Sequence, residues 1–321
     1  MNWSYIKKFF PIIGVGLFIY LLIKLDVVKI FNQITSLNIF YLGIAFLLFF
    51  IFFFFQTLKW TIIAWKQRID IPFKDAFKIN VISDFYGFVT PAKIGGVIRA
   101  DYLKKYDGGN RGLSNFVIDK VLDLSSLFIL AFFGILISFL LYQNSIISEG
   151  YVYLLAGIAF VILICSVIFY KKESSRFLLK FIYKKFLPEK IKEKARLAFE
   201  NFYEKIPSVR FLFFVFVINI ISWIINYSAV YFIGLSLGIN INFLIFLSIL
   251  PISTLIAQIP ITINGLGTRE VTMISLFGIF AIDSVKVFSM SLLGIVIANI
   301  IPSILAIIFL IQNKKNEVHN I

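Results

Sequence analysis

The chain has 321 residues, of which 60 % are hydrophobic and 18 % aromatic, and its mean hydropathy is +0.93. Soluble domains average about 45–50 % apolar residues, so this composition indicates a polytopic membrane protein and excludes a large soluble catalytic domain within these residues. The net charge of +14 is concentrated in a few loops, which is typical of membrane-protein loops, and we expect no nucleic-acid partner. One cysteine and one histidine exclude a disulfide framework and a His/Cys metal site, so we expect neither a metal nor a cofactor.

Six apolar runs are long enough to cross a bilayer, at about 20 residues per crossing. They are residues 9–25, 40–65, 116–142, 151–170, 211–235 and 287–311. The first run follows Lys7 and Lys8 and lacks a small-residue cleavage site, so we expect an uncleaved span. The predicted fold class is all-α, a polytopic membrane helix bundle forming a single domain over 1–321.

Two further apolar segments, 79–98 and 243–282, are interrupted by helix-breaking residues. We predict that the first is a re-entrant helix pair. The second divides into half-helices 243–259 and 270–282, which form either two short tilted spans or a second re-entrant hairpin. Irregular backbone at membrane depth survives only where protein buries it or where it lines a cavity. One break in each half therefore points to a transporter-type site between inverted repeats.

The distribution of basic residues predicts the orientation in the membrane. Loops 66–78 and 171–210 contain four and twelve Lys/Arg residues, whereas loops 143–150 and 236–242 contain none. The positive-inside bias then places both termini in the cytoplasm, with the protein in the cytoplasmic membrane. Segment 171–210 links the halves 1–170 and 211–321, either as two basic amphipathic surface helices or as a solvated linker.

Each break is followed by an arginine and then a carboxylate, Arg99 with Asp101 and Arg269 with Glu270. Glycines let the backbone approach a ligand, a helix N-terminus favours anions, and a guanidinium suits phosphate. This pattern predicts an anion-binding site that binds the substrate. Its candidate residues are Pro91, Gly95, Gly96, Arg99, Asp101, Asn264, Gly265, Gly267, Arg269 and Glu270, together with Asp84 and Asp123.

Structural roles are the alternative for several of these residues. Each arginine could simply pair with its neighbouring acid or mark the membrane interface. Asp84 could cap backbone N–H groups. Asp119, Lys120 and Asp123 could form an interfacial salt-bridge cluster.

The same residues resemble a known family. Thr90-Pro91, Gly95-Gly96 and Arg99-Ala100 resemble the first signature of the lysylphosphatidylglycerol synthase transmembrane region, a flippase-like membrane family. The stretch from Asn264 to Glu270 resembles its second signature, and 119–123 resembles a third element with Lys120 in place of an arginine. Gly96 stands where the first signature is commonly acidic. The resemblance covers roughly 10–310 and implies a stand-alone membrane domain, without the soluble aminoacyltransferase domain of multidomain relatives.

The leading hypothesis is a non-enzymatic lipid translocator. Arg99 and Arg269 would contact the phosphate of an anionic phospholipid or polyprenyl-phosphate lipid from two sides of a midplane cavity. One alternative is a membrane-embedded transferase acting on lipid-linked sugars. Another is a non-catalytic membrane partner of a separate lipid-modifying transferase.

Overall fold

The computed structural model describes residues 3–90, 93–107, 111–141, 157, 207–259 and 262–318. Within these residues the chain forms helices joined by turns and contains no strand. Four of the helical stretches are long and apolar enough to cross a membrane: Ile39–Lys66, Arg111–Ile137, Val209–Ser236 and Ser284–Gln312. They coincide with four of the predicted spans, and the protein is a multi-pass membrane protein. Predicted span 9–25 coincides with helix α1 (Trp3–Lys24), while most of 151–170 and most of 171–210 lie outside the described residues.

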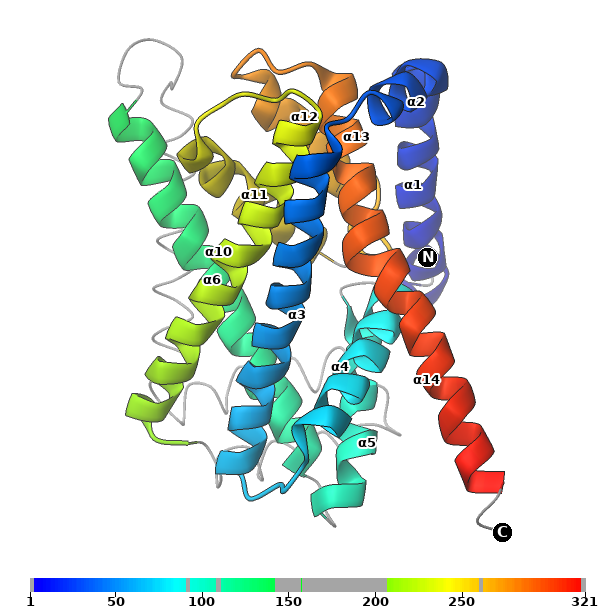
Figure 1. Ribbon diagram of the computed structural model, residues 1–321, viewed down its shortest axis with the longest axis vertical. Coiled ribbons are helices and arrows are strands. Elements are labelled where there is room, and N and C mark those ends of the chain that lie inside the picture. The colour runs from blue at the N-terminus through cyan, green and yellow to red at the C-terminus, as the bar shows by residue number, and fades with distance from the viewer. Residues whose placement is uncertain are drawn as a thin grey trace.

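Two long antiparallel helices form the centre of the bundle (Figure 1). They are α3 (Ile39–Lys66) and α10 (Val209–Ser236). Their ends meet where the Asn38 backbone N–H donates to the Ser236 carbonyl at 2.8 Å. Phe49, Trp223 and Tyr227 are buried in the largest apolar core. Phenylalanines on the opposite face of α3 are exposed, as expected for a lipid-facing surface.

The first interrupted segment is a helix pair at one end of the molecule (Figure 1). Helix α4 (Phe73–Phe88) is followed by the 3₁₀ turn η1 (Ile94–Val97) and by α5 (Ile98–Asp107). The Tyr106 hydroxyl donates to the Asp75 carboxylate at 3.1 Å, which joins the end of α5 to the start of α4. The two helices therefore form a hairpin with adjacent ends, and its re-entrant course in a membrane stays a prediction. The helix pair extends beyond both ends of the predicted segment 79–98. The prediction followed hydropathy and therefore left out the polar residues at the start of α4 and in α5.

The second interrupted segment lies toward the opposite end of the bundle (Figure 1). Helix α11 (Phe243–Ala257) and helix α12 (Thr268–Gly278) flank the predicted break. The Lys286 ammonium donates to the Gly238 carbonyl at 3.2 Å, which joins the residues just after α12 to those just before α11. The segment is therefore a helical hairpin with adjacent ends, which fits both alternatives left open by the sequence.

The remaining described helices complete the bundle. Helix α6 (Arg111–Leu141) packs against α5 and α11. Helix α13 (Ser284–Ile295) continues through the π-helical turn η2 (Val296–Ile300) into α14 (Ile301–Val318). Helix α14 packs against α4, and the short helix α2 (Val27–Thr35) packs against α13.

Candidate functional site

The first break is held by side chains that bond to the backbone around it. The Thr90 hydroxyl donates to the Tyr86 carbonyl and accepts from the Gly95 N–H, both at 2.8 Å. The Ser83 hydroxyl donates to the Gly96 carbonyl at 2.8 Å. A Cβ at Gly95 would lie only 2.2 Å from the Tyr86 carbonyl oxygen, so this close approach requires glycine. Pro91 lies outside the described residues.

The second break is held by a buried carboxylate. Asn264, Gly265 and Gly267 all have positive φ angles, 49°, 74° and 82°, which explains the two glycines. Glu270 is fully buried, and its Oε2 accepts from the Gly267 N–H at 2.6 Å. A Cβ at Gly267 would lie 2.6 Å from the Gly14 carbonyl oxygen of α1. The second break therefore lies between α1 and α12, the helix that begins directly after the break.

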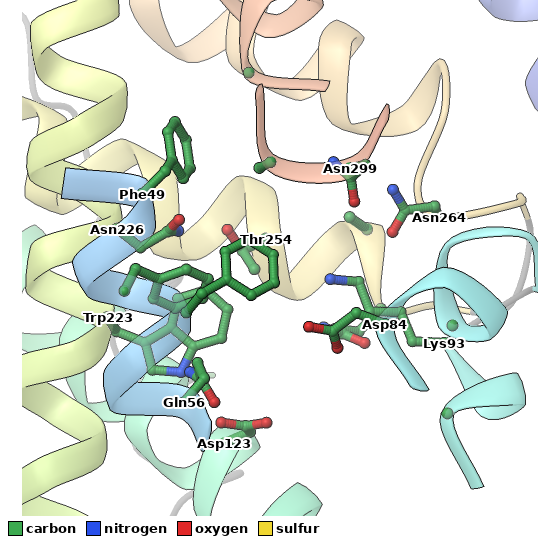
Figure 2. Close-up of a pocket in the computed structure, with 18 of the residues that line it drawn as sticks. Phe49, Gln56, Asp84, Lys93, Asp123, Trp223, Asn226, Thr254, Asn264 and Asn299 are labelled. Atoms are coloured by element: carbon green, nitrogen blue, oxygen red, sulfur yellow. The ribbon is translucent and has the colours of Figure 1, made fainter. Parts of the chain in front are cut away.

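Both breaks meet at one cavity of about 190 Å³. The first break contributes Lys93 and Gly96, followed by Arg99, and the second contributes Asn264, followed by Arg269. In Figure 2, Asp84 and Lys93 face Trp223 and Asn226 across this space. The sequence-based expectation that the two breaks serve one site is consistent with this geometry.

Arg99 is buried against the cavity wall, with 3 % of its surface exposed. Its guanidinium donates to the Asp119 carboxylate at 2.8 Å. The guanidinium carbon also lies 4.7 Å from the centre of the Trp60 ring and 5.5 Å from that of Phe116, within the range of cation–π attraction. The partner of Arg99 is thus Asp119 of α6, whereas Asp101 is exposed and pairs with Lys104.

A fully buried lysine, Lys59 of α3, joins this ion pair to a larger network. Its ammonium lies 2.8 Å from Asp119 and 2.7 Å from Asp123, and it donates to the Asn219 side chain at 3.0 Å. Asn219 in turn donates to the Ser126 hydroxyl at 2.9 Å. The network therefore connects α3, α6 and α10 at the side of the cavity that Asp119 and Asp123 line, which we call the cavity floor.

Arg269 is bound by the neighbouring carboxylate. Its Nε and one terminal nitrogen donate to Glu270 Oε1 at 3.0 and 2.8 Å. The Ser291 hydroxyl donates to the same oxygen at 2.6 Å, which links α12 to α13. Neutralisation of both arginines by buried carboxylates leaves less of their charge for a ligand.

Two charged side chains on the cavity have no hydrogen-bond or ion-pair partner among the described residues. They are the carboxylate of Asp84 and the ammonium of Lys93. Lys120 also lines the cavity and has one distant partner, Asp123, at 3.5 Å. Asp84 and Lys93 interact electrostatically with each other and with Lys120, and none of the three is held in an ion pair as short as those of the two arginines.

The predicted site residues that the structure describes fall into three groups. Those that line the cavity are Asp84, Gly96, Arg99, Asp123, Asn264 and Arg269. Gly95, Gly265, Gly267 and Glu270 shape the breaks behind its surface, and Asp101 lies apart from it.

Sequence reasoning missed Lys59 altogether and gave Lys93 no role. Lys59 is the one charged residue of the predicted span 40–65. Because charge inside a span is costly and is generally paired or functional, this isolated lysine was the available signal.

Comparisons with known proteins agree with the fold and the motifs. The family model described as the lysylphosphatidylglycerol synthase TM region matches residues 11–306. A UPF0104 membrane protein of Pyrococcus horikoshii is 25 % identical over 330 residues, covering 96 % of this chain and 98 % of that protein. Two UPF0104 membrane proteins of Methanocaldococcus jannaschii are also similar. One is 23 % identical and covers 89 % of this chain and 89 % of its own length. The other is 27 % identical and covers 65 % of this chain and 86 % of its own length.

Proposed function

The chain belongs to the lysylphosphatidylglycerol synthase TM region family, and on that premise we propose that it translocates a phospholipid or lipid-linked headgroup across the cytoplasmic membrane. The observation that carries this proposal is the convergence of two helix breaks, one from each half of the chain, on a single cavity. Broken helices that meet around a polar cavity are the usual architecture of a transported substrate's site.

The helix boundaries support the predicted inverted repeat. Helices α3, α4 and α5 start at residues 39, 73 and 98, and α10, α11 and α12 start at 209, 243 and 268, a difference of 170 in each case. Arg99 and Arg269 differ by the same number. Each interrupted segment also packs against the opposite half of the chain. Helix α4 of the first half contacts α14 of the second, and α11 of the second half contacts α6 of the first.

The two halves of the cavity differ in charge. At the 170-residue spacing, Asp84 corresponds to Thr254 and Lys120 corresponds to Met290, and all four line the cavity. The ionic wall thus comes mainly from the first half. Under the orientation predicted by the basic loops, with both termini cytoplasmic, Asp84, Lys93 and Arg99 of this wall belong to the cytoplasmic hairpin, and its other charged residues belong to α6.

The available charges define how the headgroup would bind. Lys93 and Lys120 supply the phosphate contact, because both arginines are already bound to buried carboxylates. Asp84 faces any cationic part of the headgroup. Phe49, Trp223 and other aromatic side chains on the opposite wall give the apolar part of the lipid a matching surface.

The test is the profile of lipids that co-purify with the protein, measured by native mass spectrometry. The variant is Lys93→Met/Lys120→Met, and the matched control is Lys104→Met/Lys105→Met on the exposed face of α5. We expect one phosphate-bearing lipid class to be enriched in the wild type and in the control, and to be lost from the cavity variant. Lipid profiles that mirror the bulk membrane in all three proteins would contradict the proposal.

The lysines are better targets than the arginines for this test. Replacing Arg99 or Arg269 would leave Asp119 or Glu270 buried with one cation fewer. Such a variant loses stability as well as any ligand contact, so a lost lipid could not be assigned to the site.

A further inference from the structure

The short helix α2, which connects α1 to α3, has three different sectors around its axis. The first sector faces the bundle. Ile30 is 3 % exposed and packs with Phe288 of α13, and Ile34 contacts the same cluster. Gln33 borders this sector, and its side-chain amide donates to the Leu237 carbonyl at 3.1 Å. Helix α2 is therefore held by the protein along one side.

The second sector is apolar, and no described residue covers it. Val27, Val28 and Phe31 are all more than half exposed, with 64 % of the surface of Phe31 accessible. At about 100° of rotation per residue, these three side chains fall within one sector beside the buried one. Thr35 lies among them, and its hydroxyl donates to the Asn32 carbonyl at 3.0 Å. Clustered apolar side chains of this kind mark a contact surface.

The third sector is polar. It contains Lys29 and Asn32, which are both exposed. Asp26 caps the start of the helix, where its carboxylate accepts from the Val28 N–H at 2.9 Å. A helix with one sector on the protein, one apolar sector and one polar sector fits the place where protein, lipid and water meet.

The position of α2 also points to a membrane surface. It lies at the end of the bundle where α3 and α13 begin (Figure 1). Helix α3 is long and apolar enough to cross a membrane, and Ile39 and Phe40 in its first turn are exposed. On the other side of α2, Ile23 near the end of α1 is exposed as well. Exposed apolar side chains therefore flank α2 on both sides in the chain.

We propose that α2 is an interfacial helix whose apolar sector inserts into the lipid of one leaflet. Lys29 and Asn32 face the water beside it. The occupant of the apolar sector is the bilayer because lipid already surrounds the first turn of α3, which follows α2 directly. Under the orientation predicted by the basic loops, this leaflet is the extracytoplasmic one.

The inserted helix supports one wall of the cavity. Ile30 of α2 packs with Phe288 of α13, and one turn further along α13 the Ser291 hydroxyl donates to Glu270 at 2.6 Å. Because Glu270 holds the second break, the lipid contact of α2 fixes the helix on which that break rests. This inference concerns a surface outside the cavity and does not depend on the transported lipid.

The test measures the surroundings of single residues of α2 in lipid nanodiscs. Each variant carries one cysteine labelled with a small fluorophore, in a chain whose native cysteine is changed by Cys165→Ser. The matched pairs are Phe31→Cys with Asn32→Cys and Val28→Cys with Lys29→Cys. All four positions are exposed in the structure, so only the surroundings distinguish the members of a pair.

Two quenchers report these surroundings. One is phosphatidylcholine with a nitroxide high on its acyl chain, and the other is iodide in the water. We expect the nitroxide lipid to quench the labels at positions 28 and 31 at least about threefold more than those at 29 and 32, and iodide to show the reverse order. The two pairs are independent, so one pair still decides the question if a variant of the other fails to fold.

Two results would overturn the inference. Equal quenching by iodide at all four positions would show that α2 lies in water. Labels at 28 and 31 that neither quencher reaches would show that protein, a second copy of the chain or another partner, covers the apolar sector. Neither result would affect the translocator proposal, which rests on the cavity.

Discussion

Lys59 provides the sharpest test of how the cavity floor is held together. Its ammonium is fully buried between Asp119, at 2.8 Å, and Asp123, at 2.7 Å. At an effective dielectric constant of about 20, each contact supplies roughly 6 kcal/mol of attraction, which desolvation of the ions largely offsets. Lys59→Met would keep most of the side-chain volume but leave the two carboxylates with one cation fewer.

We expect Lys59→Met to lower the free energy of unfolding by about 3–5 kcal/mol, the usual cost of breaking a buried ion pair. The assay is equilibrium unfolding in mixed detergent micelles. Lys104→Met is the matched control, since the Lys104–Asp101 pair is more than half exposed and should cost less than about 1 kcal/mol.

A second substitution tests the physical reason for this loss. Adding Asp123→Asn to Lys59→Met removes the surplus negative charge and leaves Asp119 paired with Arg99. We expect the double variant to be more stable than the sum of the two single effects, by about 2 kcal/mol. If Lys59→Met proves as mild as Lys104→Met, or if the two effects simply add, the network does not hold the floor as argued.

Further predictions concern the breaks and the first hairpin. Gly95→Ala should destabilise the protein by about 1–3 kcal/mol because its Cβ would meet the Tyr86 carbonyl, whereas Gly278→Ala, which has open space around it, should be nearly neutral; thermal unfolding of both variants compares them. Burial, with a hydrogen bond to Asp75, raises the pKa of Tyr106 to about 12. The stability from this group is present below the unfolded-state pKa of about 10 and is lost as the pH rises toward 12, so Tyr106→Phe should show a shallower decline in unfolding titrations over this range. Glu270→Gln should weaken the link between α12 and α13 and speed amide hydrogen exchange at the start of α12, whereas an exchange rate equal to that of the wild type would contradict its role at the second break.

The sequence predicted the two breaks well because their signals are local. Proline, paired glycines and Asn-Gly are helix breakers wherever they occur, and inside an apolar run they have few structural explanations. The four helices that are long and apolar enough to cross a membrane were also predictable, since a long apolar run has one principal interpretation in a membrane protein. Whether 243–282 crosses or re-enters stays open, because the Lys286–Gly238 contact shows only that the two ends of the segment meet, and both arrangements have that geometry.

The partners of the charged residues could not be predicted in the same way. Asp101 is two residues from Arg99, but side chains at that spacing on a helix do not face each other. Asp119 reaches Arg99 only because α6 packs against α5. Lys59 was hidden because one charge scarcely changes the mean hydropathy of a 26-residue apolar run. The inverted repeat was predicted from the two breaks and from the orientation given by the basic loops, and the constant spacing of the helix starts, which supports it, came from the structure.

The most direct test of the translocator proposal is the rate of transbilayer movement in proteoliposomes. The probe is phosphatidylglycerol labelled with a fluorophore on one acyl chain, and dithionite bleaching reports its arrival in the outer leaflet. The account predicts faster movement with the wild type and with Lys104→Met than in protein-free vesicles, and a rate near the protein-free value with Lys93→Met/Lys120→Met. A wild-type rate no greater than that of empty vesicles, or an equal acceleration by the cavity variant, would contradict it.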